Sequence, residues 1–114
     1  MAGKFVLKVA KNGQYFFNLK AANGQVILTS EMYKTKDSAT DGIASVRKNA
    51  ASNDRFERKV SAKNEPFFVL TASNGQTIGK SETYSSPAAM ENGVASVMQN
   101  APTAGLDDET APKA

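Results

Sequence analysis

Apolar and polar residues alternate in three short runs at the start of the chain. The runs cover Phe5–Val9, Tyr15–Ala21 and Val26–Glu31, and the steps Asn12-Gly13 and Asn23-Gly24 separate them. An Asn-Gly step between apolar runs favours a tight hairpin turn, because both central residues must accept a positive φ. The pattern therefore predicts a three-stranded antiparallel meander.

The spacing of the apolar positions changes after Tyr33. Small and apolar residues then recur three or four positions apart, at Ala39, Gly42, Ile43, Val46 and Ala50. This spacing is typical of one buried face of an amphipathic helix. We expect the helix near residues 36–48, with Thr35 as its N-cap and Asn49 at its C-terminal end. A glycine inside a helix destabilises it by about 1 kcal/mol relative to alanine, so we expect Gly42 to permit a close helix-sheet approach.

The whole pattern occurs twice. Shifting the sequence by 51 positions aligns Lys4–Ala50 with Arg55–Ala101 without a gap, and 20 of the 47 pairs are identical. Self-similarity of this extent indicates a duplication. The second copy predicts a second helix near residues 87–99, and Ser86-Pro87 gives it a serine cap followed by a proline in the first helical turn.

Each copy has too little apolar surface to fold well by itself. A three-stranded sheet with one helix leaves a marginal core, and the linker Ala51–Asp54 is too short to hold the two copies apart. We therefore predict an α+β fold in which two tandem β-β-β-α repeats, 4–50 and 55–101, form one antiparallel sheet. Both helices pack on one face of that sheet, with pseudo-twofold symmetry. Residues 1–101 form a single domain, and 102–114 form a flexible tail rich in small and acidic residues.

The composition excludes several kinds of chemistry. The chain has no cysteine and no histidine, which removes disulfides, thiolate nucleophiles, imidazole bases and the usual zinc ligands. The net charge is only +3, although the first repeat has eight basic and three acidic residues. No segment is apolar and long enough for a membrane span. We expect a soluble cytoplasmic protein with no cofactor, no metal, no catalytic residues and no membrane association.

Three motifs resemble those of a known family. The pattern Asn-Gly-Gln, then Ser-Glu-x-Tyr, then Gly-(Ile/Val)-Ala-Ser-Val-x-x-Asn-Ala begins at Asn23, Ser30 and Gly42, and it returns 51 residues later. It is similar to the YegP-like family of small bacterial proteins, over about residues 3–102. The resemblance implies three strands, a helix and a further strand per repeat, with exchange of the strand that follows the helix. It implies no biochemical activity.

The sheet face opposite the predicted core carries the first candidate site. Strand alternation places aromatic and basic side chains there, namely Lys8, Phe16, Lys20, Lys59 and Phe67. Exposed aromatic residues mark partner surfaces, and aromatic residues interleaved with lysines also suit single-stranded nucleic acid. The first hypothesis is a non-enzymatic binding or protein-interaction module that acts through an open sheet face. Single-stranded nucleic-acid binding on the same face is the alternative, and cross-strand packing would explain the pattern without any function.

Polar residues retained at the strand ends form the second candidate site. They are Ser30, Glu31, Tyr33, Ser81, Glu82 and Tyr84. They could bind a polar ligand, or they could hold the strand-to-helix connection through backbone hydrogen bonds. A weaker alternative is an enzyme that uses Glu31 and Glu82. Such an enzyme would lack a base that titrates near neutrality.

The chain is expected to be a monomer whose two repeats form an intramolecular pseudo-dimer. Self-association through a strand edge is the remaining alternative.

Overall fold

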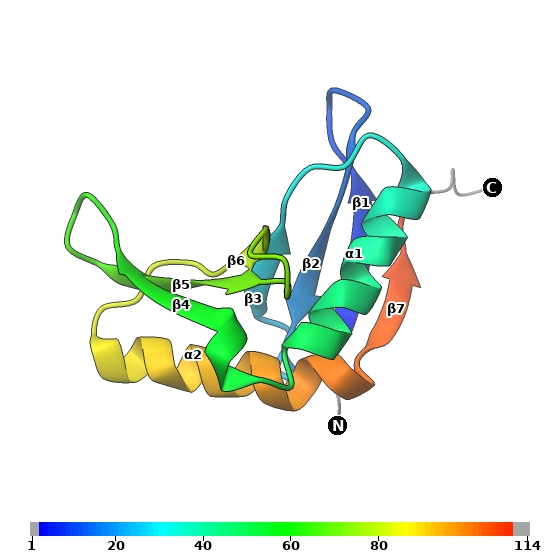
Figure 1. The fold of residues 1–114 in the computed structure, drawn as a ribbon. Coiled ribbons are helices and arrows are strands. Elements are labelled where there is room, and N and C mark those ends of the chain that lie inside the picture. Colours follow the sequence, from blue (N-terminus) through cyan, green and yellow to red (C-terminus); the bar gives the residue numbers. More distant parts are fainter. Residues whose placement is uncertain (1–2, 111–114) are drawn as a thin grey trace.

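The computed structural model describes residues 3–110. The first repeat contributes β1 (Lys4–Val9), β2 (Tyr15–Lys20), β3 (Val26–Ser30) and α1 (Lys36–Asn49). After the 3-10 turn η1 (Asn53–Arg55), the second contributes β4 (Phe56–Val60), β5 (Pro66–Thr71), β6 (Thr77–Lys80) and α2 (Pro87–Asn100). A second 3-10 turn, η2 (Ala101–Thr103), leads into β7 (Gly105–Asp108). Figure 1 shows both helices beside the sheet.

All seven strands belong to one sheet, in the order β4-β5-β6-β3-β2-β1-β7. The repeats join at the centre, where β3 pairs with β6 through Thr29 opposite Lys80 and Ser30 opposite Gly79. The predicted single sheet is therefore confirmed. The sheet is mixed, however, because β7 runs parallel to β1. The expectation of a purely antiparallel sheet is wrong at that one pair.

Strand β7 lies in the segment that we expected to be a flexible tail. Gly and Asp are poor strand formers, yet Gly105–Asp108 pairs with Lys4–Leu7 along the outer edge of β1. The N–H of Glu109 also donates to the Leu7 carbonyl at 2.8 Å. The edge of β1 offers hydrogen-bond partners to the backbone of β7, so the strand forms although its own residues have little preference for one. The last part of the expected tail, 111–114, lies outside the described residues.

Two ion pairs join the acidic residues of β7 to the first repeat. The Lys4 ammonium is 3.7 Å from the Asp107 carboxylate, and the Lys36 ammonium is 2.6 Å from that of Asp108. The hydrogen bond from Lys36, with further ones from Thr110, lowers the pKa of the Asp108 carboxyl to about 2. Because this pKa is depressed, the ion pair persists at neutral pH and is lost only as the pH falls towards 2.

The exchange of strands implied by the family resemblance is present. The chain leaves α1 and enters β4, which pairs with β5 of the second repeat. It leaves α2 and enters β7, which pairs with β1 of the first repeat. The strand that follows α1 therefore belongs to the second repeat, and the strand that follows α2 pairs with the first. Each repeat thus uses a strand that follows the helix of the other.

A chain that ends at Ala104 is expected to fold with reduced stability. Removing β7 exposes the outer edge of β1 and deletes a short parallel ladder. Each backbone hydrogen bond contributes about 0.5–1.5 kcal/mol, so we expect the free energy of unfolding to fall by roughly 1–2 kcal/mol. Urea unfolding followed by circular dichroism measures this change. A chain ending at Thr110 is the control, and equal stability of both truncations would contradict a structural role for β7.

The helices begin where the capping residues predict. The Thr35 hydroxyl accepts a hydrogen bond from the Ser38 N–H at 3.1 Å, and the Ser86 hydroxyl accepts one from Ala89 at 3.1 Å. Such caps satisfy N–H groups that have no partner within the helix. Among residues 3–110, neither helix has the length and hydrophobicity to cross a bilayer.

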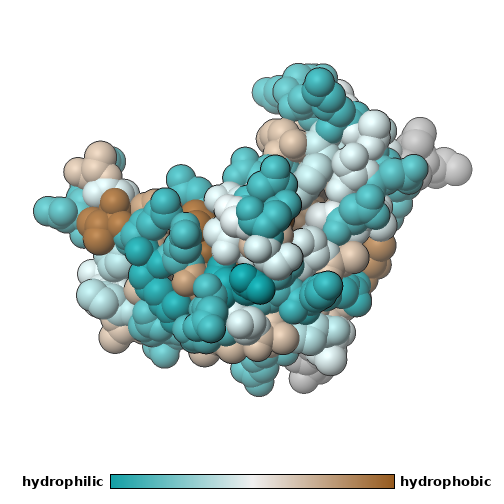
Figure 2. Space-filling view, in the orientation of Figure 1, coloured by the Kyte–Doolittle hydropathy of each residue, from teal (hydrophilic) through white to brown (hydrophobic). Residues whose placement is uncertain are grey.

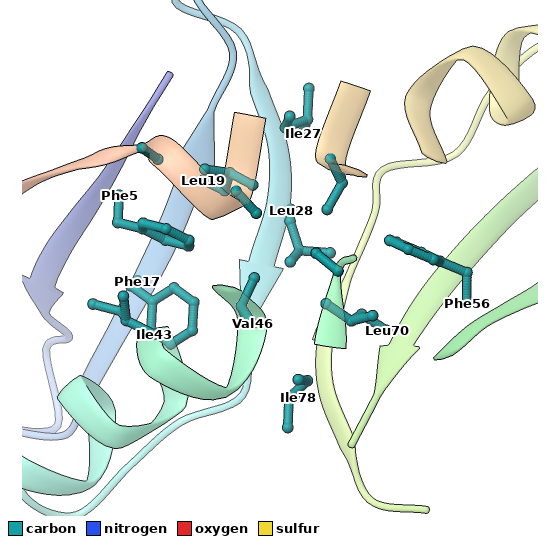
Figure 3. Packing of buried hydrophobic residues seen from close by; sticks show 14 of the residues in the cluster. Phe5, Phe17, Leu19, Ile27, Leu28, Ile43, Val46, Phe56, Leu70 and Ile78 are labelled. Carbon is teal, nitrogen blue, oxygen red and sulfur yellow. The ribbon is translucent and has the colours of Figure 1, made fainter. Parts of the chain in front are cut away.

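Both helices cover the same face of the sheet and share one core. Figure 3 shows Phe5, Phe17 and Ile43 on one side, Phe56 and Leu70 on the other, and Leu28 between them. These residues belong to one continuous cluster that also includes Val94 and Val97 of α2. The helix glycines fit this packing as expected, since a Cβ at Gly42 or Gly93 would lie within 3 Å of a tyrosine hydroxyl. Glycine therefore lets each helix approach its tyrosine.

Candidate functional site

The sheet face opposite the helices is a basic surface crossed by all seven strands. We call it the open face and define it by the register of the strand pairs, which puts the following residues on it: Lys4, Val6, Lys8, Phe16, Asn18, Lys20, Thr29, Glu57, Lys59, Phe67, Val69, Lys80 and Asp107. Lysines outnumber carboxylates among them. Both helices lie on the other face, and β7 extends the edge of the sheet. All five residues of the first sequence-predicted site are on the open face.

Each repeat presents a lysine directly opposite a phenylalanine. In the first hairpin Lys8 is paired with Phe16, and in the second Lys59 is paired with Phe67. Side chains opposite one another on antiparallel strands are in contact range. Both residues of the pair are identical in the two copies. The duplicated sequence therefore places the same cation-aromatic pair on both arms of one continuous sheet.

Lys80 is an open-face residue that the sequence analysis missed. Its ammonium lies over the Phe67 ring, 5.0 Å from the ring centroid. This distance allows a cation-π attraction of about 0.5–1 kcal/mol at an exposed site. The signal in the sequence was its position directly after the buried Gly79, because alternation along a strand puts neighbouring residues on opposite faces. Both aromatic side chains of the open face, Phe16 and Phe67, are only partly exposed.

Most lysines of the open face have no nearby carboxylate. Lys4 is 3.7 Å from Asp107, and Lys59 is 4.0 Å from Glu57. Within residues 3–110, Lys8, Lys20 and Lys80 form no ion pair. Like charges that are not neutralised locally attract anionic groups of a partner.

The strand-end serines have a structural role. The Ser30 hydroxyl accepts a hydrogen bond from the Phe17 N–H at 2.8 Å and donates one to the Glu31 carbonyl at 2.8 Å. Ser81 makes the same two bonds, to Phe68 and Glu82, at 2.9 and 2.8 Å. Both serines are buried. Each hydroxyl accepts the N–H of the neighbouring strand where the chain leaves the sheet, and the Ser81 N–H still donates to the Phe68 carbonyl at 2.9 Å. This is the structural interpretation of the motif.

The strand-end tyrosines pack against the core. Tyr33 stacks on Phe17 with ring centroids 6.3 Å apart, and Tyr84 stacks on Phe68 at 6.2 Å. Burial, and then the neighbouring glutamate, raises the pKa of each tyrosine hydroxyl above its ordinary value. Both phenols therefore stay protonated at neutral pH and can donate hydrogen bonds.

The two candidate sites lie apart, and the second divides into two halves. Ser30 is on the helix face of the sheet, as its pairing with Gly79 and the alternation along β3 require. Because β3 and β6 are antiparallel, the chain leaves them in opposite directions, so Glu31 and Glu82 lie at opposite ends of this strand pair. The carboxylates therefore do not form the close pair that general acid-base catalysis would use. Residues 3–110 also contain no cluster of three carboxylates suited to a metal ion.

The fold and the duplicated motifs define a tandem α+β protein with two copies of one unit in a single sheet. Comparison with known families identifies that unit: the family described as a domain of unknown function, DUF1508, matches residues 10–57 and again 61–108. The chain belongs to this family. Each match starts near the second strand of a repeat and ends in the strand after the helix, so β7 is part of the family unit.

Similar proteins occur in several bacteria. The UPF0339 protein YegP of Yersinia pestis is 56% identical over 108 residues, which is 95% of this chain and 96% of that protein. A UPF0339 protein of Pseudomonas aeruginosa is 56% identical over 110 residues, covering 96% of this chain and 100% of the relative.

Two solution NMR structures have the same fold. A UPF0339 protein from Shewanella oneidensis gives a TM-score of 0.90 at 45% identity, covering 96% of this chain and 93% of its own. YegP from Escherichia coli, described as a protein of unknown function, gives 0.93 at 42% identity, covering 99% and 97%. The family resemblance seen in the sequence is therefore confirmed, and these relatives assign no activity.

Proposed function

We propose that the chain is a non-enzymatic binding protein whose open face holds an acidic segment of a partner protein. The observation that carries this proposal is the repeated pair of lysine opposite phenylalanine, Lys8–Phe16 and Lys59–Phe67, on one continuous sheet. The aromatic rings supply apolar contact area, and the lysines supply charges complementary to carboxylates. Lys20 and Lys80 extend the basic surface between the two pairs.

Charge complementarity favours an acidic partner over an apolar one. Val6 and Val69 are the aliphatic residues of the open face on β1 and β5, but they are 1% and 6% exposed, so they offer little area for docking. The helix side does not supply a large apolar surface either: Figure 2 shows mostly hydrophilic residues there, with small separate hydrophobic patches. Recognition by unpaired lysines is therefore the stronger basis for binding.

Single-stranded nucleic acid is the second candidate. Lysines beside aromatic rings on a sheet can neutralise phosphates while bases stack on the rings. Base stacking requires a free ring face, however, and the Lys80 ammonium already lies over the Phe67 ring. Both rings are also partly buried by their neighbours. These two observations place the acidic protein segment ahead of nucleic acid.

Titrating the full chain with a short glutamate-rich peptide is expected to shift amide resonances along β2 and β5. Affinity should fall as salt rises, because surface charges are screened. Lys8→Gln combined with Lys59→Gln should weaken binding roughly tenfold, a change of about 1.4 kcal/mol. The matched control is Lys11→Gln with Lys63→Gln, which removes equal charge from the exposed hairpin turns.

A parallel titration with oligo(dT) separates the two candidates. Binding of the oligonucleotide in preference to the peptide would replace the first candidate with the second. Equal weakening by the control pair would show attraction to net charge alone and would contradict a site on the open face. No binding of either probe at low salt would contradict both candidates.

A further inference from the structure

A pocket of about 480 Å³ lies on the helix side of the molecule, between the turn that joins β2 to β3 and the helix α2. In Figure 1 this turn descends beside α2. The first repeat supplies one wall through Ala21–Ile27, and the second supplies the other through Glu82–Tyr84 and Ala89–Ser96. Pockets that hold small ligands generally measure about 300–1,000 Å³. The site exists only because the two repeats pack together.

The polar part of the lining has one ionised group. Hydrogen-bonding side chains come from six residues: Asn23, Gln25, Glu82, Tyr84, Asn92 and Ser96. Of the lining residues in the described part of the chain, Glu82 alone is charged, and none is a lysine or arginine. Its side chain is exposed, and it forms no ion pair within residues 3–110. In a protein with a net charge of +3, this pocket is a local site of negative charge.

The remaining lining is apolar. Aliphatic groups come from the same two walls as the polar ones, namely from Ala21, Val26, Ile27 and Ala89. The Tyr84 ring is fixed by stacking on the buried Phe68. Its hydroxyl lies beside Gly93 of α2 and adds a hydrogen-bond donor to the lining. The pocket therefore combines a carboxylate, neutral amides and aliphatic groups.

We infer that this pocket binds a small aliphatic amine through a charge-assisted hydrogen bond from its ammonium group to Glu82. The aliphatic chain lies against Val26 and Ile27, and the amides of Asn23, Gln25 and Asn92 can take the polar end of the ligand. A cation paired with a carboxylate in a partly enclosed site forms one of the stronger hydrogen bonds in proteins. The pocket meets the open face only at the end of the β2–β3 pair, where Val26 is opposite Lys20. The inference does not depend on the proposed function.

The duplication supplies a matched control for this site. Glu31 and Tyr33 occupy the equivalent sequence positions in the first repeat. The residues equivalent to Val26 and Asn92 differ, since Thr77 and Asp41 stand there. Loss of the Glu31 carboxylate changes the total charge as much as loss of Glu82 does. A specific site therefore predicts different effects for the two substitutions.

The test titrates the full chain with putrescine and follows amide chemical shifts. Resonances of the β2–β3 turn and of Ala89–Ser96 are expected to move, and 1,4-butanediol, its neutral analogue, should produce little change. Glu82→Gln should weaken putrescine binding roughly tenfold, while Glu31→Gln leaves it nearly unchanged. Ala89→Leu, which fills the pocket and keeps the carboxylate, should also abolish binding. Circular dichroism confirms that each variant is folded.

Three outcomes would overturn the inference. Equal binding of the diol would show that the ammonium group is not recognised. Equal loss in both glutamate variants, with shifts spread over acidic residues elsewhere, would show attraction to general surface charge. Unchanged putrescine binding by folded Ala89→Leu would place the ligand outside this pocket. None of these outcomes bears on the open face, whose own titration is read from β2 and β5.

Discussion

Replacing Phe68 with alanine is expected to lower the free energy of unfolding by about 3–5 kcal/mol. The Phe68 side chain is 0% exposed, lies edge-on to Phe56 at 5.6 Å and stacks on Tyr84. Truncating a buried phenylalanine removes its transfer free energy and leaves a cavity. Urea unfolding, followed by circular dichroism, measures the loss. Val60→Ala is the control, because Val60 is 63% exposed and its truncation should change stability by less than about 0.5 kcal/mol.

Phe17→Ala should have a similar effect, because the same aromatic row is repeated. Phe17 is 0% exposed and lies between Phe5 and Tyr33. Since the core continues through Leu28 into the second repeat (Figure 3), both variants should still unfold in one transition. Two separate transitions in either variant would contradict a shared core, and so would full stability after either substitution.

The features that the sequence predicted well depend on local chemistry. Thr35 and Ser86 begin the helices because a hydroxyl in that position accepts a hydrogen bond from an N–H of the first turn. The hairpin turns lie at the Asn-Gly steps, and Gly24 and Gly75 have the expected positive φ. The expectation that both residues of the step have a positive φ is wrong for the asparagines, because Asn64 is the one non-glycine residue with a positive φ among residues 3–110. In the β4–β5 turn, where the repeat has Asn64 in place of Gly13, asparagine adopts the same left-handed conformation with φ of 62°.

The features that the sequence did not predict depend on contacts between segments that are far apart in the chain. Strand β7 forms because the edge of β1 is available to Gly105–Asp108, although these residues have little preference for a strand. Lys80 joins the site because the β5–β6 register places its ammonium over Phe67. The pocket by α2 has walls from both repeats. No pattern within one segment reports such contacts.

The strand-end motif shows a different limit of sequence reasoning. Ser30 and Ser81 are retained in both copies, which suggested either a ligand site or a backbone role. Their hydrogen bonds to Phe17 and Phe68 account for the serines fully. Glu82 and Tyr84, from the same motif, line the pocket. One retained motif therefore contains both structural residues and candidate ligand-binding residues, and only geometry separates them.

The junction between the repeats explains one divergence in the sequence. Leu28 and Gly79 occupy equivalent positions, 51 residues apart, and both lie where β3 meets β6. The Leu28 side chain is 1% exposed. A Cβ on Gly79 would lie 2.8 Å from Cγ and Cδ2 of Leu28. The space at the junction therefore accepts one leucine and not two, so the copies had to differ here.

Gly79→Leu is accordingly expected to lower the free energy of unfolding by about 2–3 kcal/mol, because it overpacks the junction against a fully buried side chain. Combining it with Leu28→Ala should recover part of the loss, since the smaller residue makes room for the new leucine. A double-mutant cycle measured by urea unfolding then gives a favourable coupling of at least about 1 kcal/mol between the two positions. Strictly additive losses would show that the two side chains do not compete for one space, and would contradict this account of how the repeats are joined.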